Sequence, residues 1–230
     1  TLWKRLESYV LRHAAACRFT TERAAITYRQ RYPMAQARCH VIENGYDEDA
    51  FNGVEPDRFG APANKLLILH SGLIYPKDRN PSTFFSAINS LLQKKMIDRE
   101  NLCIRFRAPY HDEEVLASAQ QYGLQDVVEV AAPVPYQRAI AEMLGADLLL
   151  VFQGSSFNAQ IQAKIYEYLR TGRPVFAVVD PSGDTAAVLR QFPLVYVADI
   201  SSGVIVGNRL EEAFYDMKIG AQAGVAEKNI

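Results

Sequence analysis

The sequence predicts an α/β fold, in which a parallel β-sheet carries helices on both faces. From Lys65 to about residue 200, short apolar runs alternate with longer segments that have apolar residues along one helical side. Strands that alternate with helices are joined by crossovers, so they pair in parallel and their sheet is covered on both faces. Hydrophobic residues make up 49% of the chain and charged residues 22%, which supplies enough apolar material for a substantial core.

The first part of the chain predicts helices that lie outside this sheet. Residues 2–31 carry apolar side chains at a spacing of four and are predicted to be helical. A second helical piece spans residues 21–31, where Thr20 or Thr21 can cap its start and Pro33 ends it. We therefore assign residues 1–40 to a separate helical unit.

A segment rich in Gly, Pro, Asp and Asn follows at residues 41–64 and contains an Asn44-Gly45 turn. This composition predicts a linker, and it places the main domain boundary before a sheet domain at residues 65–200. Residues 201–230 are predicted to form a helical tail. Its apolar side, with Leu210, Phe214 and Met217, is expected to pack back on residues 1–31; the alternative is a frayed end.

The alternation within residues 65–200 can be resolved into individual elements. Strands are predicted at residues 66–70, 102–107, 127–131, 147–152, 174–179 and 194–197. The predicted helices lie between and after them, at residues 81–95, 112–122, 136–144, 160–171 and 184–190. The result is a Rossmann-like parallel sheet, and ligands of such sheets bind beyond the carboxyl ends of the strands.

Charge, cysteine content and motifs exclude several classes of protein. A net charge of −1 argues against a nucleic-acid partner, and no P-loop or G-x-G-x-x-G motif is present. Cys17, Cys39 and Cys103 are scattered, which predicts free thiols and no metal site. No apolar run reaches the ~18 residues of a membrane span, and the charged start predicts no signal peptide. We expect a cytoplasmic protein, with peripheral membrane association as the alternative.

The segment AKIYEYLRTGRPVFAVV, at residues 163–179, is the most informative motif. Lys164 and Glu167 are three residues apart, so they share one face of a helix. The preceding loop, FQGSSFNAQIQ, leads into the helix N-terminus, where unpaired N–H groups favour an anion such as a pyrophosphate. A carboxylate one turn further can accept hydrogen bonds from both hydroxyls of a ribose. An ordinary surface ion pair is the alternative for Lys164 and Glu167.

Three further segments stand in consistent order with this motif, and the four together resemble the retaining group 1 glycosyltransferases with the GT-B fold. Besides residues 163–179, the similar segments are VIENGYDEDAF, ILHSGLIYPKDRNPSTFFSAI and VVEVAAPVPYQRAIAEMLGADLLLVF. They cover roughly residues 40–190. The resemblance implies that the chain is the C-terminal, donor-binding half of a GT-B fold, and that residues 1–40 are the end of an N-terminal domain.

The resemblance also implies roles for individual residues. Glu167 matches the glutamate that holds the donor ribose, and Lys77 or Arg79 matches the catalytic basic group that meets the phosphates. A solvated pair of loop charges is the alternative for Lys77 and Arg79. Among the other donor-binding positions, Lys164 matches the lysine before this glutamate and Gly72 matches the glycine after the first strand. Val134 matches the loop that packs against the nucleobase. The backbone of Ile161 and Gln162 matches the groups that cradle the pyrophosphate.

The implied activity is hexosyl transfer, with retention, from a nucleotide-diphosphate sugar to a glycan or lipid-linked glycan. No cofactor and no metal are expected. The acceptor would bind to an N-terminal domain of the same protein, so this chain alone is expected to be inactive. Ala159 and Leu73 depart from the family pattern, which often has an acid and an arginine there. These departures leave two alternatives open: a degenerate nucleotide-binding module, or another GT-B enzyme such as a sugar-nucleotide epimerase.

Overall fold

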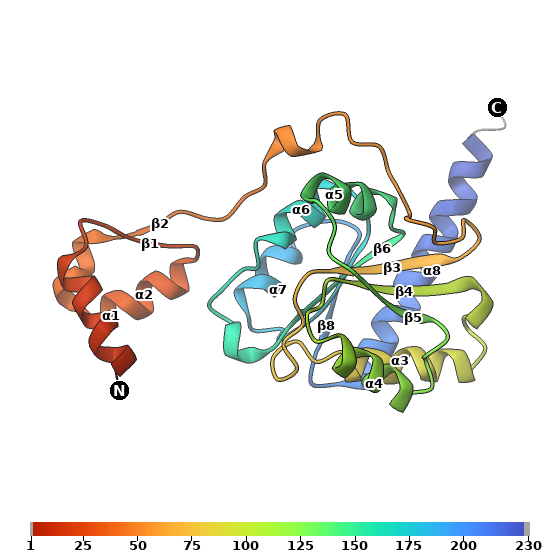
Figure 1. Cartoon of the computed structure of the whole chain (residues 1–230), viewed down its shortest axis with the longest axis horizontal. Coiled ribbons are helices and arrows are strands. Elements are labelled where there is room, and N and C mark those ends of the chain that lie inside the picture. The colour runs from red at the N-terminus through yellow and green to blue at the C-terminus, as the bar shows by residue number, and fades with distance from the viewer. Residues whose placement is uncertain (1, 228–230) are drawn as a thin grey trace.

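A six-stranded parallel sheet forms the centre of the molecule, as the sequence predicts (Figure 1). The computed structural model describes residues 2–227, and their side chains as far as residue 218. The strands lie in the order β5-β4-β3-β6-β7-β8, and each neighbouring pair is parallel. Their bounds are β3 Leu66–Ser71, β4 Leu102–Arg107, β5 Val128–Ala131, β6 Leu148–Gln153, β7 Val175–Val179 and β8 Val195–Asp199.

Helices cover both faces of this sheet. Their bounds are α3 Ser82–Gln93, α4 Asp112–Gln121, α5 Tyr136–Gly145, α6 Lys164–Arg170, α7 Asp184–Leu189 and α8 Gly203–Glu227. Side chains of α3, α4 and α8 form one hydrophobic cluster with the sheet, and side chains of α5, α6 and α7 form the other. The α/β class is therefore confirmed.

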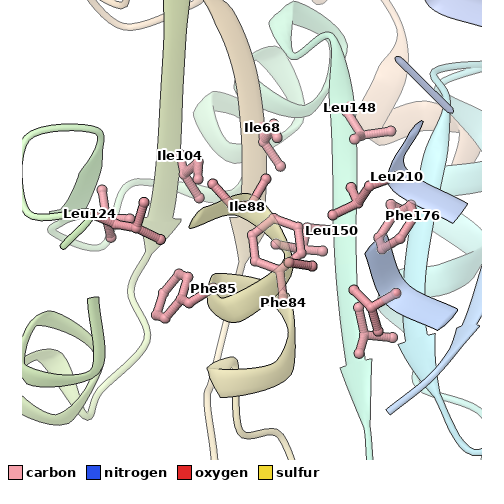
Figure 2. Packing of buried hydrophobic residues seen from close by; sticks show 14 of the residues in the cluster. Ile68, Phe84, Phe85, Ile88, Ile104, Leu124, Leu148, Leu150, Phe176 and Leu210 are labelled. Atoms are coloured by element: carbon pink, nitrogen blue, oxygen red, sulfur yellow. The ribbon is translucent and has the colours of Figure 1, made fainter. Parts of the chain in front are cut away.

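Alternation along each strand explains the two clusters. In β3, Ile68 belongs to the α3 side, whereas Leu67 and Leu69 belong to the α5 side. Successive side chains of a strand point to opposite faces, so an unbroken apolar run can serve both cores. Figure 2 shows Phe84, Phe85 and Ile88 of α3 packed against the strands on the first side. The close agreement of the predicted strands with the observed ones follows from this two-sided burial.

The tail helix corrects one expectation. It does not pack on residues 1–31; α8 instead lies along α3 and β8. Leu210 and Phe214 are buried in the cluster on that face, and Met217 packs against its margin. This position removes the apolar side of α8 from water by burying it against the sheet and α3, which stabilises the packing.

The N-terminal unit contains two short strands that the sequence did not predict. It comprises α1 Leu2–His13, β1 Cys17–Phe19, α2 Glu22–Arg31, a 3₁₀ helix Pro33–Arg38 and β2 Cys39–Val41. The strands β1 and β2 pair in parallel. Three-residue strands are too short to produce a recognisable period in sequence. Thr21 caps α2, as one of the two predicted candidates, by accepting from the N–H of Ala24 at 3.1 Å.

An extended segment joins this unit to the sheet domain (Figure 1). Within the predicted linker, a 3₁₀ helix at Glu48–Phe51 buries Phe51 in the cluster on the α5 side. The unit also contacts the sheet domain directly. Thr21 Oγ1 donates to the carbonyl of Ala159 at 2.7 Å, and Arg23 pairs with Asp184 at 2.8 Å. Within residues 2–227, no helix combines the length and the hydrophobicity needed to cross a bilayer.

Candidate functional site

The strand order creates a cleft at the carboxyl end of the sheet. The chain adds β4 and β5 on one side of β3 and then returns to place β6 on the other side. The loops that follow β3 and β6 therefore diverge, and this is where open parallel sheets bind ligands. A cleft of about 410 Å³ lies there, lined by Leu73, Tyr75, Arg79, Gln153, Phe157, Gln160, Ile161, Gln162, Ala163 and Lys164.

Lys164, the first residue of α6, reaches back to the end of β3. Its Nζ donates to the carbonyl oxygen of Ser71 at 2.7 Å. Gly72, with φ +112°, lies so close that a Cβ there would be 2.8 Å from the Lys164 Nζ. Burial, reinforced by the positive charge of Arg79, lowers the pKa of Lys164 to about 7, against the opposing effect of Glu167. The amino group is thus a donor whose charge state is balanced near neutral pH.

Tyr168 holds the same strand end one helical turn further along α6. Its hydroxyl accepts the N–H of Ser71 at 2.9 Å, and the side chain is fully buried. Residues four apart on a helix share one face, so Lys164 and Tyr168 together clamp both backbone groups of Ser71. Tyr168 is therefore a core residue that also positions the end of β3.

Arg79 supplies the second cation of the cleft. Its guanidinium lies 4.6 Å from the centre of the Tyr75 ring, and Nη1 donates to the carbonyl of Leu73 at 3.0 Å. Burial lowers the pKa of Arg79, which remains charged because arginine titrates far above neutral pH. Lys77 belongs to the same loop but is exposed and does not line the cleft. The structure therefore brings together Arg79 and Lys164, and leaves Lys77 apart.

Gln153 shapes the opposite wall of the cleft, and the sequence analysis missed it. This last residue of β6 is buried, and its Nε2 donates to the carbonyls of Phe157 and Gln160 at 2.7 and 2.9 Å. Its Oε1 accepts from Thr185 Oγ1 at 2.9 Å. The sequence feature that could have indicated Gln153 is its position, a polar residue at the carboxyl end of the otherwise apolar strand β6. These bonds hold the loop in a non-helical path, which is why α6 begins at Lys164 and not near residue 160 as predicted.

The loop before α6 presents unpaired backbone donors to the cleft. Within the described side chains and backbone of residues 2–218, the N–H groups of residues 161–164 have no acceptor. Ile161 is buried, and its carbonyl accepts from Asn44 Nδ2 at 3.2 Å. Gln162 is anchored by a 2.7 Å bond from its Nε2 to the carbonyl of Phe152. Free N–H groups beside two cations make this wall suited to an anion.

Glu167 lies one turn beyond Lys164 and outside the residues that line the cleft. Its Oε1 accepts from the hydroxyl of Tyr136 at 2.7 Å. This bond raises the pKa of Tyr136 to about 12 and engages only one carboxylate oxygen. Tyr136 begins α5, just after the half-buried Val134, so the loop after β5 and the face of α6 adjoin. Tyr136 was a further residue that the sequence did not single out.

Two other features near the strand ends are structural. Arg105 and Arg107 both bond the fully buried carboxylate of Glu142, at 2.8 and 2.6 Å to its Oε1. These bonds form a buried ion-pair network centred on Glu142, in which both arginines are structural. His70 is buried between Phe106 and Phe152, and desolvation, followed by the charge of Lys164, lowers the pKa of its ring well below the usual value. Among the described residues, no group of three His, Cys, Asp or Glu side chains could hold a metal ion.

Comparison with known proteins identifies the fold. No protein-family model and no curated protein sequence match the chain. Solved structures, however, match the chain over most of its length. A sucrose-phosphate synthase from Thermosynechococcus elongatus superposes with a TM-score of 0.69 at 13% identity, over 93% of this chain and 52% of its own. A glycosyltransferase from Rickettsia africae gives a TM-score of 0.69 at 13% identity, over 94% of this chain and 57% of its own.

WaaG, a glycosyltransferase involved in lipopolysaccharide biosynthesis, gives a TM-score of 0.66 at 18% identity, over 85% of this chain and 52% of its own. The chain thus spans about half the length of the structures that it matches. At these identities the likeness concerns the fold. The chain therefore has the Rossmann-like α/β fold found in GT-B glycosyltransferases, over about half of their length.

Proposed function

We propose that the cleft binds the diphosphate of a nucleotide sugar and that the chain is the donor-binding part of a glycosyltransferase. The convergence of Arg79, Lys164 and the free N–H groups of residues 161–164 at the switch point carries this proposal. Each of these groups is a donor, and two are cations, so together they match the charge and the oxygen acceptors of a diphosphate. The fold shared with glycosyltransferases supports the same assignment.

In sugar transfer from such a donor, negative charge develops on the departing diphosphate. Donors that are already oriented stabilise this charge without reorganising during the reaction. Arg79 is oriented by the Leu73 carbonyl and Lys164 by the Ser71 carbonyl before any ligand binds. We assign to both the role of leaving-group stabilisation. The exposed Lys77 would contribute only through its longer-range charge.

The nucleoside would extend from the diphosphate along α6. Glu167 stands one turn past Lys164, and its carboxylate retains acceptor capacity for ribose hydroxyls beside the Tyr136 bond. Val134 would contact the base from the loop after β5. On this proposal, the diphosphate lies in the cleft and the nucleoside lies outside it, between α5 and α6.

Acceptor binding belongs to the part of such proteins that this chain does not span. We propose an N-terminal domain of the same protein as the partner that binds a glycan or lipid-linked glycan, and transfer of a hexose with retention. The half-length match to the related structures supports this division. No metal is proposed, because Arg79 and Lys164 supply the positive charge.

Calorimetric titration with UDP, GDP and ADP, and with the matching nucleosides, tests the proposal. Arg79→Ala should weaken the preferred diphosphate at least tenfold and leave its nucleoside nearly unchanged, because only the diphosphate meets the guanidinium. Arg99→Ala removes an exposed arginine that pairs with Asp126 and serves as the control. Absence of binding by all three diphosphates, or equal loss for diphosphate and nucleoside, would refute the proposal.

A degenerate nucleotide-binding module is the second candidate, and Ala159 favours it. The related family often places an acid that contacts the donor sugar at this position, whereas here the Ala159 carbonyl is bonded by Thr21. A module without sugar recognition would bind the diphosphate and the nucleotide sugar with equal affinity. A donor-binding domain would discriminate among nucleotide sugars that share one nucleotide, so a titration series of such sugars separates the two candidates.

A further inference from the structure

The N-terminal unit contains two cysteines that face each other across paired strands. Cys17 begins β1 and Cys39 begins β2, and the parallel register places them directly opposite. Opposite residues of neighbouring strands point to the same face, and such strands lie ≈ 4.7–4.9 Å apart. Disulfides join Cα atoms usually 4.4–6.8 Å apart, so this register meets the distance requirement without unfolding either strand.

The two thiols differ in exposure. Cys39 is buried in the small cluster of the unit with Leu11, Tyr32 and Ala35, and Cys17 packs against that cluster while remaining half-exposed. Both thiols are free. Cys103, the third cysteine, lies in β4 and packs in the hydrophobic cluster on the α5 side of the sheet. Cys17 and Cys39 are thus neighbours, with one thiol open to solvent and one behind it.

We propose that Cys17 and Cys39 form a redox-active pair that closes to a disulfide under a peroxide oxidant. The Cys17 thiolate attacks one oxygen of the peroxide, the O–O bond breaks, and hydroxide leaves as Cys17 becomes a sulfenic acid. The Cys39 thiolate then attacks the Cys17 sulfur, the S–S bond forms, and the S–O bond breaks to release a second hydroxide. The two thiol protons convert both hydroxides to water, so two thiols and one hydrogen peroxide give one disulfide and two waters.

The order of these steps follows from the environment of each sulfur. Access decides which thiol meets the oxidant first, which assigns the first step to Cys17. Burial, followed by the neighbouring Cys17, raises the pKa of Cys39, so Cys39 is protected from direct oxidation and acts as the resolving thiol. Arg29 donates to the carbonyl of Cys39 at 2.9 Å. Its positive charge opposes part of this rise in pKa, which favours the Cys39 thiolate that the second step requires.

Closure of this pair would bear on the cleft through α2. The disulfide would join β1 to β2 and enclose α2, which contains Arg23 and is capped by Thr21. These residues bond Ala159 and Asp184, and Ala159 belongs to the loop that forms one wall of the cleft. Oxidation would therefore add a covalent cross-link within the N-terminal unit, the unit that contacts the proposed diphosphate-binding loop.

Peptide mapping of the folded chain after treatment with hydrogen peroxide tests the proposal. We expect a peptide pair joined through Cys17 and Cys39, two hydrogens lighter than the sum of the reduced peptides and separated again by dithiothreitol. Cys103→Ser should give the same product. Oxidation of the chain in guanidinium chloride provides the reference, because all pairings of the three cysteines are then accessible.

Two variants test the order of steps. In Cys39→Ser, the Cys17 sulfenic acid should persist and be trapped by dimedone; in Cys17→Ser, Cys39 should remain a thiol under the same treatment. Rapid oxidation of Cys39 in Cys17→Ser would overturn the assigned order. Three free thiols in the oxidised wild-type chain, or the same mixture of pairings as in guanidinium chloride, would overturn the pair itself, independently of whether either variant folds.

Discussion

Lys164 and Gly72 form a close contact in which the Lys164 Nζ lies 2.8 Å from the position of a missing Cβ on Gly72. Gly72 also has φ +112°, a backbone conformation that other residues rarely adopt. Both constraints act at the same point. The lysine can be drawn against the end of β3 only because residue 72 has no side chain.

Replacing Gly72 with Ala should therefore displace the Lys164 amino group and weaken nucleoside diphosphate binding about tenfold or more. Backbone strain should also lower the free energy of unfolding by about 1–3 kcal/mol. Gly60→Ala is the matched control, because Gly60 also has a positive φ (+78°) and no atom within 4 Å of its Cβ position. Urea denaturation should show a lower free energy of unfolding in both variants. Calorimetry should show weaker nucleoside diphosphate binding only in Gly72→Ala. Equal binding losses would contradict the lysine contact.

The pKa of Lys164, lowered to about 7 by burial and then by Arg79, predicts proton uptake on binding. Near pH 8 the free amine is mostly neutral, and a bound diphosphate favours the charged form, so its pKa rises and a proton is taken up. Affinity should fall as the pH rises above about 7. Calorimetry at pH 8 in two buffers of different ionisation enthalpy measures the uptake.

Lys164→Arg supplies the control for this measurement, since a guanidinium stays charged throughout the range. Proton uptake should disappear in this variant while diphosphate binding is retained in part. Undiminished uptake in Lys164→Arg would assign the proton to another group.

Glu167→Gln should weaken nucleoside diphosphate binding roughly tenfold or more, because hydrogen bonds to charged groups are worth about 1.5–3 kcal/mol. Gln keeps an oxygen acceptor for the Tyr136 hydroxyl, so the fold should change little. A 2′,3′-dideoxy diphosphate is the control ligand: wild type and variant should bind it alike, since the diol is already missing. Equal losses for both ligands, or an earlier thermal transition, would make Glu167 a structural residue.

Glu142→Gln should lower the free energy of unfolding by roughly 3–5 kcal/mol, because it removes the carboxylate that pairs with the buried guanidinium of Arg107 and leaves Arg105 paired with Glu129 alone. Glu129→Gln is the matched control. Glu129 also pairs with Arg105, but its side chain is 47% exposed, and pairs of this kind contribute about 0–1 kcal/mol. Urea denaturation distinguishes the two. Similar decreases in the free energy of unfolding for the two variants would show that solvent reaches the ion pairs of Glu142.

The chain by itself should bind a nucleoside diphosphate and transfer no sugar, because it spans about half the length of the glycosyltransferases that it resembles. Incubation with a panel of nucleotide sugars and a glycan acceptor, followed by measurement of released diphosphate and of glycan mass, tests this. Efficient transfer by the isolated chain would contradict the assignment of acceptor binding to another domain.

Local periodicity was sufficient to predict the sheet domain. Apolar runs bounded by Gly, Pro and polar residues placed all six strands and five of the helices to within a few residues. The four inner strands, β3, β4, β6 and β7, are buried on both faces, and the helices bury one side each. The loop before α6 and the residues Arg79, Lys164, Ile161 and Gln162 were also recognisable in sequence, and the structure brings them into one cleft. Their roles, and those of Glu167 and Val134, remain predictions.

Tertiary structure alone decided the contacts that shape this cleft. The bond from Lys164 to Ser71 joins residues 93 positions apart, and the bond from Tyr136 to Glu167 joins residues 31 apart. A periodic pattern reports which side of an element is buried, but it carries no information about which distant element will cover it. For the same reason, the packing of α8 on α3 and the pairing of Cys17 with Cys39 could not be predicted from the sequence.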